Sequence, residues 1–339
     1  MITAEKMWKL GQTYLKSKVQ PIPLWVHLWV TDNCNLDCNY CSVKNNSSRD
    51  PETEEVKQWI EHADNLGSAV IAFMGGEPTL RTDLVELVTH ADSKLLMTYV
   101  TTNAKHKSFD TLLLNLAKAG LDVLEVSLDG CDSIKGSEKT LGGNEDLIDL
   151  LDSVRQEYGL KFKAHQVLAP ENLGETLKLL ELAERRNLPI SFGLVNALDG
   201  SAYSNSRDRD RLRQTLYTII DKKKAGVPIL NPVEYFTHAF AFLNSGTNWK
   251  CDVGKYVLQV ATSGQVYVCS VVPLISEDRF LDIDKSYFEK ANPAREKLLT
   301  TCKKTCYSAC AFSTSFFRKN PSELIKLYKR ESSITSKEV

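Results

Sequence analysis

Three cysteines stand close together near the start of the chain, in the segment Cys34-Asn-Leu-Asp-Cys38-Asn-Tyr-Cys41. Thiolates are the usual ligands of iron–sulfur clusters, and three on one short loop can hold three irons of a four-iron cube. The fourth iron then has no protein ligand and can bind a substrate or cofactor. A zinc site with a fourth ligand from elsewhere is the alternative. We therefore expect a metal centre at Cys34, Cys38 and Cys41.

The chain has 339 residues and nine cysteines, five of which follow residue 250. A secreted disulfide framework favours an even number of cysteines in a much smaller chain, whereas short spacings favour metal binding. Charged residues make up 25% of the chain and the net charge is −1, so no overall field attracts nucleic acid or an anionic membrane. The apolar stretch 24–30 is too short to span a bilayer, and the preceding residues lack the order of a signal peptide. We expect a cytoplasmic protein with no transmembrane segment.

Strand and helix patterns alternate after a polar helix and a Pro-Ile-Pro entry within residues 1–22. Apolar runs predict six strands, and amphipathic spacing predicts helices between them, the first with Thr53 as its N-cap. Strand–helix repeats of this kind favour a parallel sheet with right-handed crossovers. The predicted strands are 24–30, 69–74, 96–102, 122–128, 161–168 and 190–195, and the helices between them are 54–66, 84–91, 109–119, 146–158 and 175–187.

The fourth strand has one apolar and one polar face. Leu124, Val126 and Leu128 alternate with Glu125, Ser127 and Asp129. A flat parallel sheet covered on both faces would be apolar on both, so the polar row predicts the inside of a barrel that holds a polar ligand. Six units rather than eight predict an open, partial (β/α)6 TIM-like barrel with its ligand site at the C-terminal strand ends. Helices are expected near 209–225 and 232–243, then a β-hairpin over 256–269 that turns at Ser263-Gly264.

The spacing C-x3-C-x2-C after the first strand, with Tyr40 before the last cysteine, resembles the signature of the radical S-adenosylmethionine (SAM) superfamily. Its fold is a partial (β/α)6 barrel. The resemblance implies a [4Fe–4S] cluster whose open iron is chelated by S-adenosylmethionine, which is cleaved to a 5′-deoxyadenosyl radical that removes a hydrogen atom from substrate. A flavodoxin- or ferredoxin-type protein is the implied electron donor.

Three further segments carry the resemblance, each at the end of a predicted strand. Gly75-Gly76-Glu77-Pro78 resembles the motif that binds the methionine amino group, for which Glu77 offers an acceptor. Thr101-Thr102-Asn103 is similar to the family's T-N-G segment, with Ala104 in place of glycine. Ser127-Leu128-Asp129-Gly130 is similar to its S-L-D-G segment, which implies that Ser127 and Asp129 contact the ribose or the methionine carboxylate. Tyr40 and Leu194 are expected beside the adenine, with core packing as the alternative.

The later cysteines resemble the SPASM or twitch extension of the same superfamily, which holds auxiliary [4Fe–4S] clusters. Five cysteines favour one auxiliary cluster, with Cys251 and Cys269 as ligands. Two of the remaining three complete the set; we favour Cys306 and Cys310 and keep Cys302 open. Zinc is the competing metal, because sites of four cysteines also suit it.

Substrate contacts are expected on the fifth strand and just after the fourth and sixth strands. Lys163 and His165 share one face and reach substrate if that face is the polar interior. Cys131 is expected to be a buried, inert thiol, with donation or acceptance of hydrogen as the alternative. His27 is expected to be a core histidine with its polar atoms satisfied. Asn196 and Tyr203 follow the sixth strand near the opening.

The leading hypothesis is a radical SAM enzyme that oxidises or rearranges a biosynthetic intermediate, either a small molecule or a lipid. A peptide maturase that crosslinks or epimerises residues is the alternative; the stretch before Cys34 is too short for a precursor-recognition domain, so a partner would supply one. A non-catalytic iron–sulfur or zinc protein is a third possibility, which has no need of a methionine site. The expected domains are an N-terminal helix (1–22), the barrel (23–200), a helical linker (201–250), the auxiliary-cluster region (251–315) and a C-terminal helix or tail (316–339).

Overall fold

The computed structural model describes residues 2–41, 44–195, 206–245, 254–269, 274–289, 295–297, 300 and 309–323. Its described strands form one sheet in the order β6-β5-β4-β3-β2-β1-β7-β8-β9. Neighbouring strands from β1 to β6 are parallel. The strands are β1 Trp25–Thr31, β2 Val70–Gly75, β3 Met97–Thr102, β4 Val123–Ser127, β5 Lys161–Leu168, β6 Ile190–Leu194, β7 Val257–Val260, β8 Gln265–Cys269 and β9 Leu274–Arg279.

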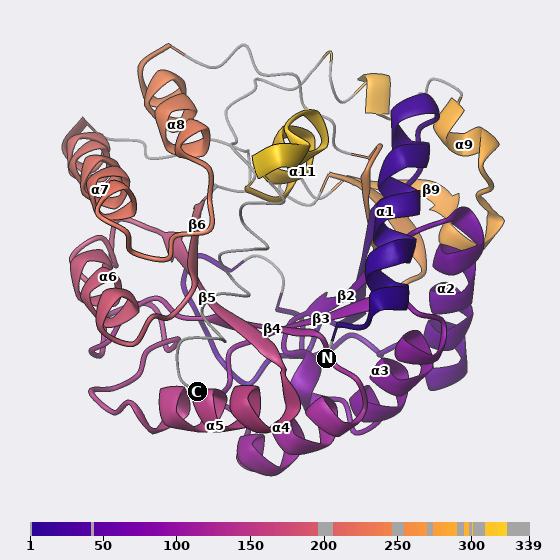
Figure 1. Cartoon of the computed structure of the whole chain (residues 1–339), viewed down its shortest axis with the longest axis horizontal. Helices are drawn as coiled ribbons and strands as arrows, with labels where there is room; N and C mark the ends of the chain where they lie inside the picture. The colour runs from indigo at the N-terminus through magenta and orange to yellow at the C-terminus, as the bar shows by residue number, and fades with distance from the viewer. Residues whose placement is uncertain are drawn as a thin grey trace.

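Helices connect these parallel strands and form a ring outside the sheet (Figure 1). The helices are α1 Ala4–Val19, α2 Thr53–Leu66, α3 Leu84–Ser93, α4 Phe109–Lys118, α5 Asp146–Tyr158, α6 Thr176–Arg185, α7 Ser206–Lys224, α8 Val233–Ser245, α9 Ser286–Glu289 and α11 Ala309–Lys319, with short 3₁₀ turns η1 Pro78–Leu80 and η2 Phe280–Asp282. The described architecture confirms the predicted partial barrel. No helix among the described residues is long and apolar enough to cross a membrane.

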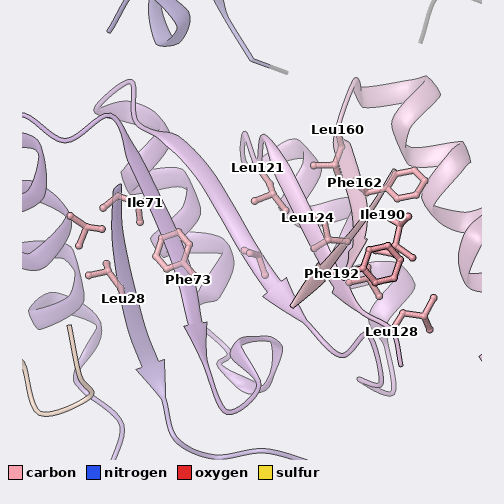
Figure 2. Close-up of a cluster of buried hydrophobic side chains, with 14 of the residues drawn as sticks. Leu28, Ile71, Phe73, Leu121, Leu124, Leu128, Leu160, Phe162, Ile190 and Phe192 are labelled. Carbon is pink, nitrogen blue, oxygen red and sulfur yellow. The ribbon is translucent and has the colours of Figure 1, made fainter. Parts of the chain in front are cut away.

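The outer face of the sheet carries the main hydrophobic core. Strand side chains alternate, so Leu28, Phe73, Leu124 and Phe192 pack between the strands and the helices (Figure 2). Leu124 and Phe192 are completely buried. Burial of such side chains stabilises the fold by roughly 2 kcal/mol each. The inner face is left for polar residues, as the alternation along β4 predicted.

Helix α1 packs its inner side against the N-terminal ends of the strands. Met7 and Leu10 pack with Trp25 and Tyr99 around the buried Val70. Lys6, which is 2% exposed, forms ion pairs with Asp122 and, at 2.6 Å, with Asp92. The helix predicted within residues 1–22 is confirmed, and it closes the end of the barrel opposite the strand C-termini.

The predicted hairpin is confirmed and has an additional role. Strands β7 and β8 are antiparallel, and Gly264 at the turn has φ +78°, which favours glycine. The unexpected feature is that β7 pairs in parallel with β1, so the hairpin extends the barrel sheet. Helix α11 contacts β6, β7 and α8. It therefore bridges the open side of the partial barrel, between its last strand and the strand beside its first.

The prediction of Thr53 as N-cap of the first inter-strand helix is wrong. Thr53 is the first residue of α2, and Glu52 takes the N-cap position with no capping hydrogen bond from its side chain. The Thr53 hydroxyl instead donates to Asp83 at 2.7 Å. The Thr53 side chain thus binds a residue that is distant in the sequence and does not cap its own helix. The division into five domains is still a prediction.

Candidate functional site

The three clustered cysteines lie on the loop that follows β1, and none of them forms a disulfide. The Cys34 sulfur accepts a hydrogen bond from the backbone N–H of Leu36 at 3.5 Å and a longer one from the Asn103 amide at 3.9 Å. The Cys38 sulfur lies 3.7 Å from the Ser137 hydroxyl. Hydrogen bonds to sulfur tune the potential of iron–sulfur clusters. Loops after β1, β3 and β4 thus contribute to this site.

The glycine pair at the end of β2 joins that strand to the cysteine loop. A Cβ on Gly75 would lie 2.0 Å from the Thr31 carbonyl oxygen, and one on Gly76 would lie 2.2 Å from that of Asn33. Gly75 also has φ +144°, which favours glycine. The backbone N–H of Gly76 donates to Thr31 at 2.7 Å. The glycines are therefore required to bring the end of β2 against the residues before Cys34.

Glu77 holds the ends of β2 and β3 together. Its carboxylate is almost completely buried and accepts hydrogen bonds from the Thr79 N–H at 3.0 Å and the Thr79 hydroxyl at 2.6 Å. It also accepts from the Thr102 hydroxyl and the Asn103 N–H, both at 2.7 Å. Pro78 begins the η1 turn beside it. Ala104 has φ +56°, a conformation that favours glycine, at the position where the family pattern carries one.

Asp129 lies beside Tyr40 of the cysteine loop. Its Oδ2 accepts hydrogen bonds from the Tyr40 hydroxyl and from the Ser137 hydroxyl, the latter at 2.6 Å. Its other oxygen, Oδ1, is buried with no partner among the described residues. Burial and the Asp129 charge raise the pKa of Tyr40 well above its usual value, so the phenol stays protonated. An unpartnered buried carboxylate oxygen is costly unless a ligand donates to it.

These observations test whether the site suits a cluster and its cosubstrate. The donor set is three thiolates on one loop, with N–H and O–H groups beside two of the sulfurs, which fits a [4Fe–4S] cluster. The unpartnered oxygen of Asp129 is an acceptor that fits a ligand hydroxyl or ammonium group. Within the described residues, no group of three or more His, Cys, Asp or Glu side chains is arranged so that it could hold a single metal ion.

An ion pair occupies the polar inner face of the sheet. Lys163 of β5 binds Glu125 of β4 at 2.6 Å, and each side chain is less than one-fifth exposed. The ammonium lies 5.6 Å from the centre of the Tyr99 ring, and the Thr101 hydroxyl lies 3.5 Å from the Glu125 carboxylate. Burial alone would raise the pKa of Glu125, but the Lys163 ammonium outweighs it and lowers this pKa to about 2. Both members are therefore charged at neutral pH.

Two histidines flank this pair. His165 Nδ1 lies 2.9 Å from the Ser191 hydroxyl, and Ser127 is opposite His165 in the strand register. Burial lowers the pKa of His165, and it lowers that of His27 to about 4, so both rings are neutral. His27 was expected to have its polar atoms satisfied. Its Nδ1 instead is buried without a hydrogen-bond partner in the described part of the chain.

The structure places some predicted site residues away from this interior. Leu194 lies two residues after Phe192 on β6, so both side chains point to the same face, and Leu194 packs in the core outside the sheet. The backbone N–H of Cys131 donates to Glu175 at 3.1 Å, and burial raises the pKa of its thiol to about 11. Cys269 ends β8 and is buried. The predicted residues that lie outside the described part are Asn196, Tyr203, Cys251, Cys302 and Cys306.

The interior includes residues for which no role was predicted. Glu125 was recognised only as part of a polar row, although its position opposite Lys163 in a parallel register could have suggested the pair. Tyr99 lies on β3 and Ser191 on β6, on either side of the two strands that carry the pair, and neither had a sequence signal of its own. The arrangement offers charged donors and acceptors below the cysteine loop and the Asp129 carboxylate.

Comparison with known proteins identifies the family of the barrel region. Residues 30–183, a little under half of the chain, match the radical SAM superfamily. This part of the chain is therefore a radical SAM domain, a type of domain that uses a [4Fe–4S] cluster and S-adenosylmethionine.

The relatives include proteins named for quite different substrates. GTP 3′,8-cyclase of Lactiplantibacillus plantarum is 33% identical over 215 residues, which are 61% of this chain and 64% of that protein. PqqA peptide cyclase of Rhodopseudomonas palustris is 35% identical over 173 residues, 48% of this chain and 44% of that protein. The structure of Streptococcus suis SuiB bound to precursor peptide SuiA is similar in fold, with a TM-score of 0.61, 17% identity and coverage of 86% of this chain and 70% of that one. The chain spans between 52% and 64% of the length of the first curated relatives.

Proposed function

We propose that this protein is an enzyme that cleaves S-adenosylmethionine reductively and acts on a substrate held inside the barrel. When bound, the cluster and S-adenosylmethionine supply a 5′-deoxyadenosyl radical that removes a hydrogen atom from substrate. The observation that carries the proposal is the meeting of the cysteine loop, the Gly75-Gly76 turn and the unpartnered Asp129 oxygen at the C-terminal strand ends. A non-catalytic cluster carrier has no use for this combination.

The residues of the chain have distinct tasks in this proposal. Cys34, Cys38 and Cys41 hold the cluster and leave one iron open. Glu77 fixes the strand ends that the methionine moiety approaches, through its four hydrogen bonds to Thr79, Thr102 and Asn103. Asp129, oriented by Tyr40 and Ser137, presents one carboxylate oxygen to the ligand. A flavodoxin- or ferredoxin-type protein supplies the electron.

For the substrate, our leading proposal is a biosynthetic intermediate that is oxidised or rearranged, with an auxiliary [4Fe–4S] cluster at the later cysteines. A peptide substrate is the second candidate. It is supported by the relatives named for peptides and by the interior pair of Lys163 and Glu125, which offers donor and acceptor side by side at 2.6 Å, as an amide group requires.

The test is anaerobic reconstitution of the cluster, reduction with dithionite and addition of S-adenosylmethionine. We expect 5′-deoxyadenosine and methionine in equal amounts, and neither product from a Cys38→Ala variant. The matched control is Cys131→Ser, because the neighbours of Cys131 are Glu175 and Asp132 rather than the cysteine loop. A fully loaded wild-type protein that makes no 5′-deoxyadenosine would exclude the enzymatic proposal.

A further inference from the structure

Helix α1 carries apolar side chains on the side that faces away from the barrel. Trp8 is 70% exposed, Leu15 66% and Val19 87%. With about 3.6 residues per turn, these three side chains point within roughly 40° of one another. They lie on the opposite side of the helix from Lys6 and Ser17, which are buried against the barrel. Large exposed apolar side chains that gather on one face mark an interaction site.

This apolar face has a glycine at its centre, Gly11. A Cβ at this position would meet no atom of the described chain within 4 Å, so packing inside the protein does not require a glycine here. Glycine within a helix costs about 1 kcal/mol relative to alanine. At the surface it has a use, because the distance between two packed helices depends on the side chains at the contact, and glycine lets a second helix approach closely. The exposed residues Ala4, Trp8, Gly11, Leu15 and Val19 are called the α1 stripe below.

The order of residues along the α1 stripe is complementary to itself. When a second α1 helix runs antiparallel and the two helices meet beside Gly11, Trp8 of one copy lies opposite Leu15 of the other. Ala4 then lies opposite Val19. A two-fold axis repeats each contact, which is the arrangement of an isologous interface. Each pairing sets a larger side chain against a smaller one, so a second copy of this chain fits the stripe along its whole length.

The charges beside the α1 stripe select the antiparallel direction. Glu5 and Lys16 are both exposed and lie about three helical turns apart, so they flank the same side of the stripe. An antiparallel copy brings its Lys16 to Glu5 and its Glu5 to Lys16, which gives two intermolecular ion pairs. A parallel copy would set like charges against each other, which costs free energy. An anionic bilayer would attract Lys16 but repel Glu5, so the charge pattern favours a second copy over a lipid surface.

We propose that this protein forms a symmetric homodimer through antiparallel packing of its α1 stripes. The contact buries on the order of 400–500 Å² per copy, since a tryptophan alone can bury roughly 150–250 Å². A standard stable interface buries about 800 Å² per partner, so this dimer is weak and forms at micromolar concentrations. Because α1 packs at the N-terminal strand ends, the cysteine loop at the opposite ends stays open in both copies. The dimer goes beyond the proposed function and does not depend on it.

Sedimentation velocity of the full chain from about 1 to 200 μM tests for the dimer. We expect a sedimentation coefficient that rises with concentration from the monomer value to the dimer value. Trp8→Gln should raise the dimer dissociation constant about tenfold or more, because a buried tryptophan in a small interface carries much of the binding energy. The matched control Leu177→Gln, which changes an exposed apolar residue of α6, should leave this constant unchanged. A monomer at every concentration, or equal effects of the two variants, would overturn the inference.

Exchange of the two charges tests the direction of pairing. Lys16→Glu sets a negative charge against Glu5 of the other copy in both contacts and should weaken the dimer about fivefold. Addition of Glu5→Lys to this variant should restore wild-type association, and circular dichroism of dilute samples would verify that both variants are folded. A double variant as weak as the single one would contradict antiparallel packing. Binding of the monomer to phosphatidylserine vesicles, with loss of binding in Trp8→Gln, would assign the α1 stripe to a lipid surface and likewise overturn the inference.

Discussion

The carboxylate of Glu77 accepts the backbone N–H of Asn103 at 2.7 Å and thereby ties the end of β2 to the end of β3. Its other oxygen accepts three hydrogen bonds, from the Thr79 N–H and from the Thr79 and Thr102 hydroxyls. Because the Asn103 amide approaches the Cys34 sulfur, this carboxylate also positions a group beside the cysteine loop. Glu77 is therefore a structural element of the site as well as a candidate ligand contact.

Replacement of Glu77 by glutamine should destabilise the protein. Both carboxylate oxygens of Glu77 accept hydrogen bonds, so the glutamine NH2 group would replace one acceptor and face an N–H or O–H donor. A buried donor left without an acceptor costs about 1–3 kcal/mol. Urea unfolding of the apoprotein would measure this loss. The control is Glu138→Gln, a carboxylate that accepts the exposed Asp37 N–H. Equal stability of the two variants would show that the Glu77 network has no net effect.

Removal of the Tyr40 hydroxyl should weaken S-adenosylmethionine binding and leave the cluster in place. Tyr40→Phe deletes one of the two donors to Asp129 Oδ2, so the carboxylate is less well oriented. Loss of one such bond is worth about 1 kcal/mol, or roughly a fivefold increase in Kd. Equilibrium binding and iron content would be measured together. A parallel loss of iron would show that Tyr40 supports the cysteine loop itself.

Replacing one member of the interior ion pair should lower the stability of the fold more than replacing both members. Lys163→Met leaves Glu125 charged and buried, a loss of about 3 kcal/mol, whereas Lys163→Met with Glu125→Leu should recover most of it. The pKa of Glu125 is lowered to about 2, so the stability due to the pair is present above pH 4.5 and is lost as the pH falls toward 2. Urea unfolding from pH 2.5 to 7 would measure this. No recovery in the double variant would show that loss of the ion pair itself, and not the unpaired charge of Glu125, causes the destabilisation.

His27 should make the protein less stable in mild acid. Burial lowers its pKa from 6.5 to about 4, so the unfolded chain binds a proton in this range that the folded protein does not. Stability is therefore full above pH 6.5 and falls by on the order of 3 kcal/mol as the pH drops to 4. His27→Gln should remove this part of the pH dependence in denaturant titrations. An unchanged pH profile would mean that the ring is charged in the folded state.

Lys6 should anchor α1 to the barrel. Lys6→Met leaves Asp122 buried without its cation, at a cost of about 3–5 kcal/mol. The same change at Lys16, which is exposed, should have little effect. Thermal unfolding and hydrogen exchange of α1 would compare the two variants. Similar unfolding of both would show that apolar packing of Met7 and Leu10 suffices to hold the helix.

Much of the fold was accessible from the sequence because the strand patterns are strongly periodic. The alternation of Leu124 and Val126 with Glu125 predicted which face of β4 meets the helices, and burial confirms it. The parallel pairing of β7 with β1 was not predictable, since nothing in a hairpin pattern specifies which sheet edge it joins. Thr53 shows the same limit on a local scale, because its hydroxyl binds Asp83 and does not cap the helix.

The candidate site was predicted unevenly for a physical reason. Motifs with fixed local spacing, such as Cys34 to Cys41, indicate chemistry from residue types and spacing alone. Contacts between distant segments give no such signal. The Tyr40–Asp129 hydrogen bond joins residues 89 positions apart, and the contacts of α11 with β6 and β7 depend on how this helix crosses the barrel.

The central claim is that Cys34, Cys38 and Cys41 hold a cluster with one iron open to S-adenosylmethionine. Electron paramagnetic resonance of the dithionite-reduced protein, before and after addition of S-adenosylmethionine, measures this directly. The account predicts a [4Fe–4S]⁺ signal that changes shape and g-values on addition and that is absent from the triple alanine variant of these cysteines. A reduced cluster signal that is the same with and without S-adenosylmethionine would contradict the account.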